Sequence, residues 1–295
     1  MNILNPYRYG GVGLYPLDLF PNAVYGFALK KLKSTATLAC RVQRTSDSAE
    51  TDVYLYDDPT LSIDLNSEIS AGGILGDWIE TTINTYTTKV VTMYDQSGNG
   101  NDITGSFSGL YYNGLQVDGG SEGYGDGLNT RCRTLGTEQM SRAALTAFDS
   151  GNTFTIIGAG NMFSVQKGCL FATATSGNRA QMYMDRSATD YISQVIAATT
   201  TATSVLDAGF NNVNNNMRHQ ISVFNGGTTT LDSWRDANAD DSGDTWSGSY
   251  NNTGLYVGYL PTTNNGSFLE LIAFSDDKTA SISDIYTNFT DRYGT

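Results

Sequence analysis

One pattern recurs from about residue 110 to residue 274 and limits what the chain can fold into. Short runs alternate apolar and polar residues, and turns rich in Asn, Gly, Asp and Ser separate them. This regular spacing is typical of an antiparallel sandwich or barrel. The 32 glycines and five prolines agree with a chain of short strands and tight turns. We therefore predict an all-β protein. The expected strands are GLQVD (114–118), TFTIIGAGNM (153–162), GCLFATA (168–174), AQMYMD (180–185), ISQVIAAT (192–199), RHQISVFN (218–225), TTTLDSWRD (228–236), GLYVGYL (254–260) and GSFLELIAF (266–274).

The first hundred residues mix periods. In 21–34, Val24, Phe27, Ala28 and Leu32 share one helical face, which predicts an amphipathic helix. Its three lysines are expected on a solvated face; they are Lys30, Lys31 and Lys33. Residues 38–45 and 50–56 predict a hairpin, 74–79 a short helix and 89–94 a strand. At the C-terminus the period changes again, and a closing helix is expected over 281–294, with an apolar face of Ile282, Ile285, Phe289 and Tyr293.

The domain organisation follows from these elements. Residues 1–20 show neither period, so we predict an extended arm and one sandwich domain over 21–295. The arm carries Tyr7, Arg8, Tyr9 and Tyr15, and we expect these side chains to dock on a partner subunit or particle.

Charge and cysteine content exclude several classes of function. The net charge of −13 repels nucleic acid and anionic lipid, so neither is an expected partner. The three cysteines lack a CxxC motif, which disfavours a disulfide framework or a zinc site. Cys40 has the spacing of a buried strand residue. No apolar run could span a bilayer, and MNILNPYRYGG lacks signal-peptide features, so we expect a soluble protein folded in a reducing cytoplasm.

The loop 95–102 follows the 89–94 strand with eight turn-forming residues. Asp95, Asn99, Asn101 and Asp102 can bond backbone groups while Gly98 and Gly100 take positive φ, which predicts a rigid corner. The alternative is that Asp95 and Gln96 face a sugar or a calcium ion.

Three blocks carry a family resemblance. AVYGFALKKLKS, CRVQRTSDSAETDVYL and VVTMYDQSGNGNDITG occur in the order seen at the start of the α-L-arabinofuranosidase B catalytic domain and of related bacteriophage virion proteins. The chain resembles this group. The resemblance implies a concanavalin A-like, laminin-G-like antiparallel jelly roll with a few short peripheral helices.

The resemblance also implies where catalytic groups would lie. The family nucleophile, a glutamate, falls at Asp185, and the acid falls at Leu260 or Pro261, which carry no carboxyl group. A retaining glycosidase needs both groups, so we expect no catalysis. Four other acidic residues are alternatives for the catalytic carboxyl groups: Asp118, Glu122, Asp126 and Glu270. The single histidine, His219, shares the period of its strand and is predicted to be a hydrogen-bonded core or interface residue.

Binding groups are easier to find than catalytic ones. We predict a carbohydrate site from Trp246, Tyr250, Asn264, Asn265 and Asp95, because aromatic faces and planar amides hold sugars, and we expect Trp246 to be exposed. Trp234, Tyr256, Tyr259, Asn251 and Asn252 lie in the same turns or strands. No cofactor is expected. Calcium is an alternative for Asp236, Asp240, Asp241 and Asp244, although their spacing differs from an EF-hand.

The sequence therefore predicts a virion structural protein of a bacteriophage: a capsid decoration, head fibre or tail fibre, assembled in the host cytoplasm. We expect a homo-oligomer that joins other virion proteins through its arm and adheres to host-surface glycan. Two alternatives stay open, an arabinofuranosidase-like glycoside hydrolase and a laminin-G-like binding module of a cell-surface protein.

Overall fold

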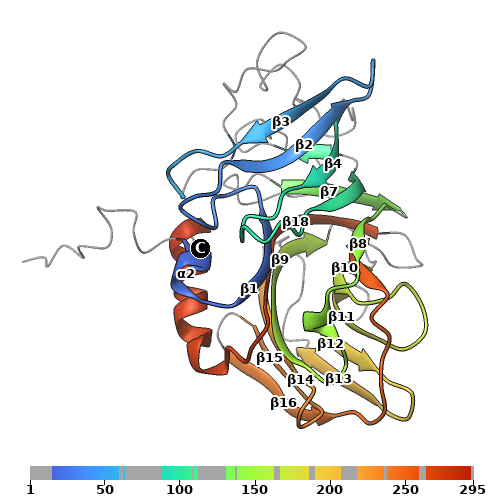
Figure 1. Cartoon of the computed structure of the whole chain (residues 1–295). Helices are drawn as coiled ribbons and strands as arrows, with labels where there is room; N and C mark the ends of the chain where they lie inside the picture. The colour runs from blue at the N-terminus through green and yellow to red at the C-terminus, as the bar shows by residue number, and fades with distance from the viewer. Residues whose placement is uncertain are drawn as a thin grey trace, which may run out of the picture.

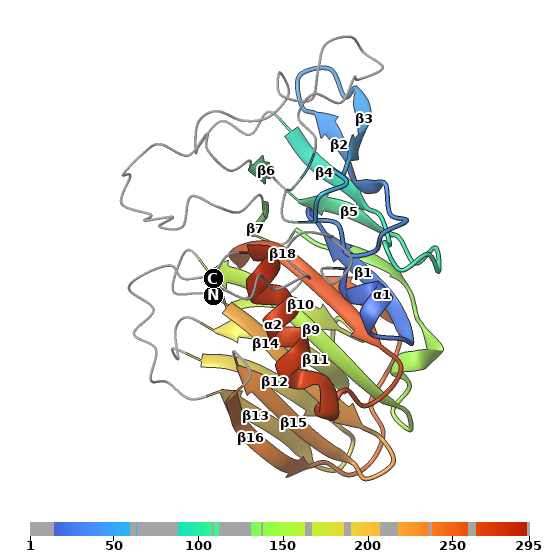
Figure 2. The same cartoon turned by 90° about the vertical axis from the view of Figure 1, so that its left-hand side faces the viewer.

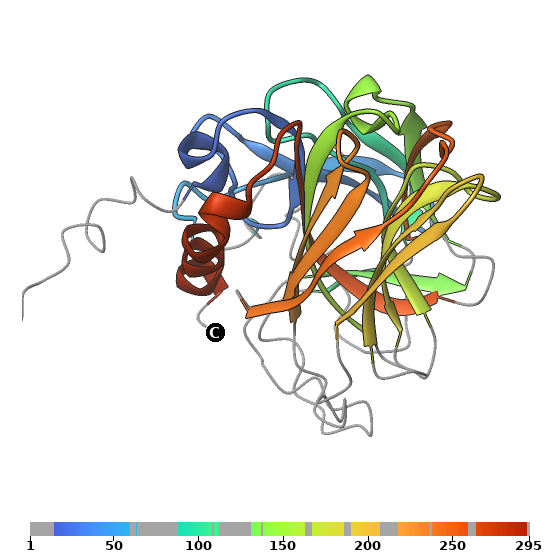
Figure 3. The same ribbon diagram turned by 90° about the horizontal axis from the view of Figure 1, so that it is seen from below.

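Two antiparallel sheets pack face to face in the protein (Figure 1). The structure is a computed structural model, and it describes residues 15–59, 63, 88–107, 109–111, 131–136, 138–162, 167–185, 190–206, 218–235, 238–258 and 264–293. Figure 3 shows the layers almost edge-on, with one helix against the outside of one sheet. The predicted all-β sandwich is confirmed.

Among the described residues, sheet A contains eight strands in the order β16-β15-β14-β9-β18-β7-β6, with β1 also paired to β18. Its members are β1 (Ala23–Ala28), β6 (Gly109–Tyr111), β7 (Arg131–Gly136), β9 (Thr153–Met162), β14 (Arg218–Asn225), β15 (Thr230–Arg235), β16 (Asn238–Thr245) and β18 (Asn264–Phe274). The bounds of β9 and β14 are those predicted from alternation. Strands β6, β7 and β16 were not predicted.

In the part of the chain that the structure describes, sheet B contains ten strands in the order β13-β12-β11-β10-β17-β8-β5-β4-β2-β3. Its members are β2 (Leu38–Arg44), β3 (Glu50–Tyr54), β4 (Thr88–Met93), β5 (Ile103–Phe107), β8 (Met140–Ala143), β10 (Lys167–Ala172), β11 (Arg179–Asp185), β12 (Asp190–Ile196), β13 (Thr201–Leu206) and β17 (Gly254–Val257). The β2–β3 hairpin and β4 are confirmed. Strands β5, β8 and β13 were not predicted, and the expected strand 114–118 and helix 74–79 lie outside the described residues.

The main core lies between the sheets. Four rings contact one another there in edge-on, tilted or stacked geometry: Phe148, Phe154, Phe171 and Phe224. Phe148 belongs to the short 3-10 helix η3 (Thr146–Phe148), which precedes β9. Cys40 is fully buried in the same core, as predicted. Among the described residues, no helix is both long and apolar enough to cross a membrane.

The predicted helix over 21–34 is wrong, because Ala23–Ala28 forms β1 and pairs with β18. Tyr25 and Phe27 face the core between the sheets, while Ala28 packs on the outer side of sheet A. Apolar residues on both faces of a strand imitate a helical stripe, and pairing with β18 overrides that local signal. The lysines also differ from expectation. Lys30 and Lys31 are only 5% and 4% exposed.

The loop 95–102 is the rigid corner that its sequence predicts. The Asp95 carboxylate accepts hydrogen bonds from the amides of Gly26, Ser97 and Asn101 at 2.9–3.0 Å. Gly98 and Gly100 have φ of 88° and 70°, in the left-handed region. The loop thus holds itself in shape and binds β1 at the same time.

Neighbouring side chains complete this contact with β1. The Gln96 amide accepts from Leu32 N at 2.7 Å and donates to the carbonyls of Ala28 and Lys30. The side-chain amides of Asn99 and Asn101 donate to Val24 O at 3.2 Å and 2.6 Å. We call this set, made by Asp95, Gln96, Asn99 and Asn101, the β1 clasp. Because its groups satisfy backbone atoms, the alternative of Asp95 and Gln96 as ligand-facing residues has no support in the structure.

Helix α2 (Ile282–Tyr293) lies across the outer face of sheet A (Figure 2). Its apolar face is the predicted one, since Ile282, Ile285, Phe289 and Tyr293 are all buried. A buried ion pair also joins helix and sheet: the Arg292 guanidinium donates to both carboxylate oxygens of Glu270, one of them at 2.9 Å. Lys30 Nζ donates to Arg292 O at 2.6 Å, and burial together with the Arg292 charge lowers the pKa of Lys30 to about 8.

The last residues of the expected arm belong to the domain. Pro16–Leu19 form a short helix, α1, and Leu17 and Phe20 join the apolar cluster outside sheet A. Tyr15 donates its hydroxyl to Asp57 O at 2.6 Å. The boundary predicted at residue 20 is therefore too late. Tyr7, Arg8 and Tyr9 lie outside the described residues, and their docking role stays a prediction.

Replacing Asp95 with Ala is expected to destabilise the domain by about 3 to 5 kcal/mol, because three backbone amides and the Ser97 hydroxyl lose a charged acceptor. Urea denaturation followed by fluorescence measures the change. Thr104→Ala, on the exposed side of β5, is the control and is expected to stay within about 0.5 kcal/mol of wild type. Equal stability of the two variants would contradict a structural role for the clasp.

Candidate functional site

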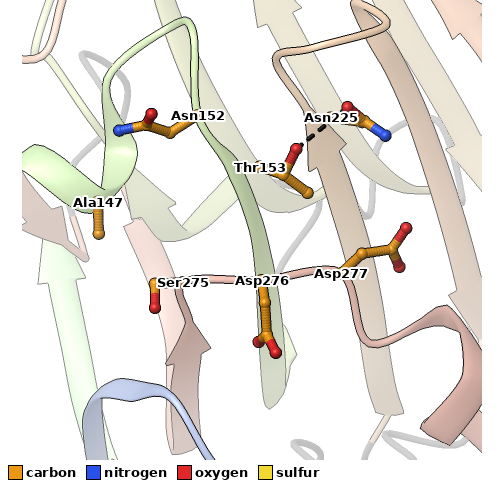
Figure 4. A pocket seen from close by; sticks show the side chains of 7 residues that line it. All are labelled: Ala147, Asn152, Thr153, Asn225, Ser275, Asp276 and Asp277. Carbon is orange, nitrogen blue, oxygen red and sulfur yellow. Dashed lines mark hydrogen bonds between the residues drawn. The ribbon is translucent and has the colours of Figure 1, made fainter.

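A hollow of about 450 Å³, lined mostly by residues of polar type, lies at one end of the sandwich (Figure 4). This volume is in the range of small-ligand pockets. The segments around it lead into or out of three adjacent strands of sheet A. The lining residues are Ala147, Asn152, Thr153, Asn225, Ser275, Asp276 and Asp277.

Strand register explains why these residues meet. Asn225 ends β14 directly opposite Thr153, which begins β9, and Phe274 at the end of β18 lies opposite Thr155. The chain ends of neighbouring antiparallel strands share one edge, so the three turns lie side by side. Thr153 Oγ1 donates to Asn225 Oδ1 at 3.1 Å across this edge.

Gly226 lets two of the turns approach closely. Its amide donates to Asn152 O at 3.1 Å, and a Cβ at this position would lie 2.5–2.6 Å from backbone atoms of Gly151 and Asn152. A side chain would force the turns apart. Asn225 and Asn152 are thus brought together by backbone packing.

The third wall is the segment 275–277, and Asn22, directly before β1, holds it in place. Ser275 N donates to Asn22 O at 3.0 Å, and Asn22 Nδ2 donates to Asp276 Oδ2 at 3.0 Å. Lys278 Nζ also donates to Asp276 Oδ2, at 2.8 Å. Oδ2 of Asp276 is therefore committed to protein groups, whereas Oδ1 is buried without a hydrogen-bond partner among the described residues. Figure 4 shows this carboxylate directed away from Asp277.

Several polar atoms at the hollow keep unused hydrogen-bonding capacity among the described residues. Asn225 Oδ1 accepts from Gly227 N and Thr228 N as well as Thr153, whereas its Nδ2 donor makes no such bond. Asn152 uses Nδ2 on Thr146 O, which leaves its Oδ1 acceptor. Asp277 uses Oδ1 on Thr279 N at 2.8 Å, which leaves Oδ2. The lining residues thus leave one amide donor, on half-buried Asn225, and two acceptors, on exposed Asn152 and Asp277, unused, in addition to the buried Asp276 Oδ1.

Sequence reasoning missed this site. The aromatic residues that were predicted to bind carbohydrate are buried instead: Trp246 and Tyr250 are 2% and 6% exposed and belong to the core. The expectation that Trp246 is exposed is wrong. The adjacent bridge between Thr200 and Ser247 links the edges of the two sheets; residues 247–249 are exposed there, whereas Trp246 and Tyr250 on either side pack into the core.

The predicted amides are not near the hollow. Asn264 and Asn265 begin β18, whereas the hollow lies beyond its other end at Phe274. Asp95 is engaged in the β1 clasp. The structure therefore does not bring these residues together with Trp246 and Tyr250.

The carboxylates considered for catalysis or metal binding are dispersed. Asp185 ends β11, and its catalytic role stays a prediction. Asp118, Glu122, Asp126 and Asp236 lie outside the described residues. Glu270 is 1% exposed and bound to Arg292 and Tyr293, so it is not available to a substrate. Within the described part of the chain, no group of three or more His, Cys, Asp or Glu side chains could hold a metal ion.

His219 is buried, as predicted, and lies under α2 with its ring centroid 4.3 Å from that of Phe289. The predicted hydrogen bonding is wrong, because neither of its ring nitrogens has a hydrogen-bond partner among the described residues. Burial, reinforced by the nearby Arg292 charge, lowers the pKa of His219 to about 3. The imidazole is therefore neutral near pH 7 and takes no part in a surface site.

No protein-family model matches the sequence, and no curated protein matches it. Solved structures do share the fold. A mutant GH54 α-L-arabinofuranosidase soaked with 4-nitrophenyl α-L-arabinofuranoside aligns with a TM-score of 0.58 and 14% identity, over 92% of this chain and 63% of that one. A second structure of a GH54 α-L-arabinofuranosidase, soaked with a cyclic sulfate inhibitor, gives a TM-score of 0.55 at 14% identity, with the same coverage.

The binding domain of Paraclostridial mosquitocidal protein 1 aligns with a TM-score of 0.51 and 11% identity, over 68% of this chain and 52% of that one. The chain spans less than two thirds of each of these proteins. At such identities the likeness establishes a common β-sandwich fold. The expected fold relationship to the arabinofuranosidases is thereby confirmed.

Acid should destabilise the wild type partly through His219. The unfolded chain binds a proton there below about pH 6.5, whereas the folded chain does so only near pH 3. Stability from this residue is thus present above pH 6.5 and is lost as the pH falls, by about 1.4 kcal/mol per unit between these values.

His219→Phe removes this proton uptake and keeps a ring against Phe289. We expect the difference in unfolding free energy between the variant and wild type to grow in favour of the variant from pH 6.5 to pH 4, measured by urea denaturation. A pH-independent difference would contradict the assignment of a neutral, buried imidazole.

Proposed function

We propose that this protein is a non-catalytic carbohydrate-binding β-sandwich and that the hollow at 152–153, 225 and 275–277 holds the sugar. The observation that carries the proposal is the set of unused hydrogen-bonding atoms on Asn152, Asn225 and Asp277. A sugar presents adjacent hydroxyl groups that both donate and accept. Planar amides and a carboxylate are the side chains that match them.

The rigidity of the hollow supports the proposal. Asn225 is fixed by three hydrogen bonds to its Oδ1, and Asp277 is fixed by Thr279 N. A site whose groups are already ordered loses less entropy when a ligand binds. Binding therefore needs little rearrangement of these turns.

The arrangement of carboxylates favours binding over hydrolysis. A retaining glycosidase places two carboxyl groups about 5–5.5 Å apart and facing the same bond. At the hollow, Asp276 is directed away from Asp277 and is paired with Lys278 and Asn22. This pair of residues lacks the opposed orientation that the chemistry requires.

The comparisons support the ligand class indirectly. The GH54 enzyme, which has the same fold, was soaked with an arabinofuranoside. We extend only the class, a saccharide, to this chain. We also propose that the sandwich is displayed on a bacteriophage particle, on the basis of the three sequence blocks that resemble phage virion proteins.

Asn225→Asp tests the sugar site with little change to the fold. The variant keeps the Oδ1 acceptor for Gly227, Thr228 and Thr153, but it replaces the Nδ2 donor with a charged acceptor. We expect affinity for a neutral methyl glycoside that binds wild type to fall about tenfold or more, by titration calorimetry. Asp291→Asn, at an exposed position of α2, is the control. Unchanged affinity in Asn225→Asp would remove the hollow from the binding reaction.

Deleting residues 1–14 tests the particle role and spares α1, which packs on the domain. We expect the sandwich to stay folded by circular dichroism while its incorporation into phage particles is lost. A chain whose first 14 residues are replaced by a Gly/Ser linker of the same length should also fail to incorporate. Normal incorporation of either variant would contradict docking through the arm.

A further inference from the structure

We infer that the hollow selects saccharides without acidic groups, neutral sugars and amino sugars, and rejects sialic and uronic acids. This inference rests on the proposed function and goes further, because it assigns the class of sugar. It starts from the charges around the hollow, which are predominantly negative among the described residues.

Two carboxylates line the hollow, and a third lies in a neighbouring turn. Asp276 and Asp277 line it, and Asp149 lies in the adjacent turn, where its carbonyl accepts from Asn152 N at 2.9 Å. The Asp149 carboxylate accepts from the neutral amide of Asn252 at 2.8 Å, so this contact leaves its charge uncompensated.

Among the described residues, one cation contacts these groups, and it is buried. Lys278 donates to Asp276 at 2.8 Å, is 6% exposed and places Nζ 4.9 Å from the centre of the Phe274 ring. Its ammonium group therefore neutralises Asp276 from within the protein. It does not offer a bidentate or exposed contact to a ligand carboxylate.

The polar atoms left at the hollow lead to the same selectivity. Asp277 Oδ2 and Asn152 Oδ1 accept hydrogen bonds, so they match the hydroxyl or ammonium donors of a sugar. Asn225 Nδ2 is the one donor left on the lining amides and carboxylates described above. A ligand carboxylate would find a single neutral donor and would lie beside like charges.

The field of the whole chain acts in the same direction. The net charge of −13 raises the energy of an approaching anion and lowers that of a cation. This long-range contribution is screened by salt, whereas contact with Asp277 is screened less. Salt dependence therefore separates the two contributions.

The test is a panel of methyl glycosides that differ in charge, titrated into the full chain by calorimetry. The panel holds glucose, galactose, arabinose, glucosamine, glucuronic acid and N-acetylneuraminic acid. Each is measured at roughly 0.01 M and roughly 0.5 M salt, where the Debye lengths are about 30 Å and about 4 Å.

We expect at least one neutral sugar or glucosamine to bind, and each acidic sugar to bind at least about fivefold more weakly. Asp277→Asn keeps Oδ1 for Thr279 and removes the charge. It should therefore reduce the ratio of the affinity for the neutral sugar to the affinity for the acidic sugar at both salt concentrations. Asp291→Asn removes a distant charge and should leave the ratio at high salt unchanged.

The failures are distinguishable. If an acidic sugar binds as tightly as the neutral ones, and Asn225→Asp weakens it, the hollow is a sugar site and the inferred selectivity is wrong. If no sugar in the panel binds at millimolar concentration, the proposed function and the selectivity both fail. The inference is also overturned if Asp277→Asn leaves the ratio of neutral-sugar to acidic-sugar affinity unchanged.

Discussion

The arrangement of the loop 95–102, strand β1 and the segment 275–277 depends on the hydrogen bonds of the Asp95 carboxylate. This carboxylate accepts from Gly26 in β1 and from two amides of its own loop, so a single charged group orders a turn and anchors a strand. Because Asn99 and Asn101 hold the carbonyl of Val24, the beginning of β1 is fixed as well. Asn22, directly before β1, then positions Ser275 and Asp276. The corner at 95–102 thus supports the hollow through the strand between them.

Helix α2 serves the sandwich rather than the site. It covers the outer face of sheet A, and the Glu270–Arg292 pair fixes its position where an apolar contact alone would permit sliding. Buried ion pairs often contribute little net stability, because desolvation offsets their attraction. Specific placement of the helix is the effect that this geometry supports. The neutral His219 beneath the helix agrees with a structural layer.

The sequence was a good guide to the fold wherever alternation was regular. Helix α2 follows from periodicity, because it buries one regular face. Strands β9 and β14 are buried on both faces, and they follow from their apolar composition and from the Asn- and Gly-containing turns beside them. Strand β1 did not follow, since its buried residues lie on both sides of the strand and imitate a helix. Strand β16 carries NADDSGDT, whose polar composition conceals its pairing with β15. Such elements form through partners distant in the chain, which local patterns do not reveal.

The site was harder to predict because its residues are ordinary turn formers. Asn152, Asn225 and Asp277 flank three predicted strands, and only strand order and register bring them to one edge. Aromatic residues gave a misleading signal, because Trp246 lies within the core. A usable signal was present in the polar residues directly bordering the ends of strands 153–162, 218–225 and 266–274. Recognising it requires knowing that those strands are neighbours.

The central claim is that the hollow binds a saccharide, and side-chain NMR tests it most directly. In a ¹⁵N-labelled chain titrated with a neutral methyl glycoside, the account predicts that the Asn225 side-chain amide signals shift together with the backbone amides of Gly226 and Asp277. Shifts confined to another surface, such as the cluster of Tyr183 and Tyr256 on sheet B, with the Asn225 signals unmoved, would contradict it.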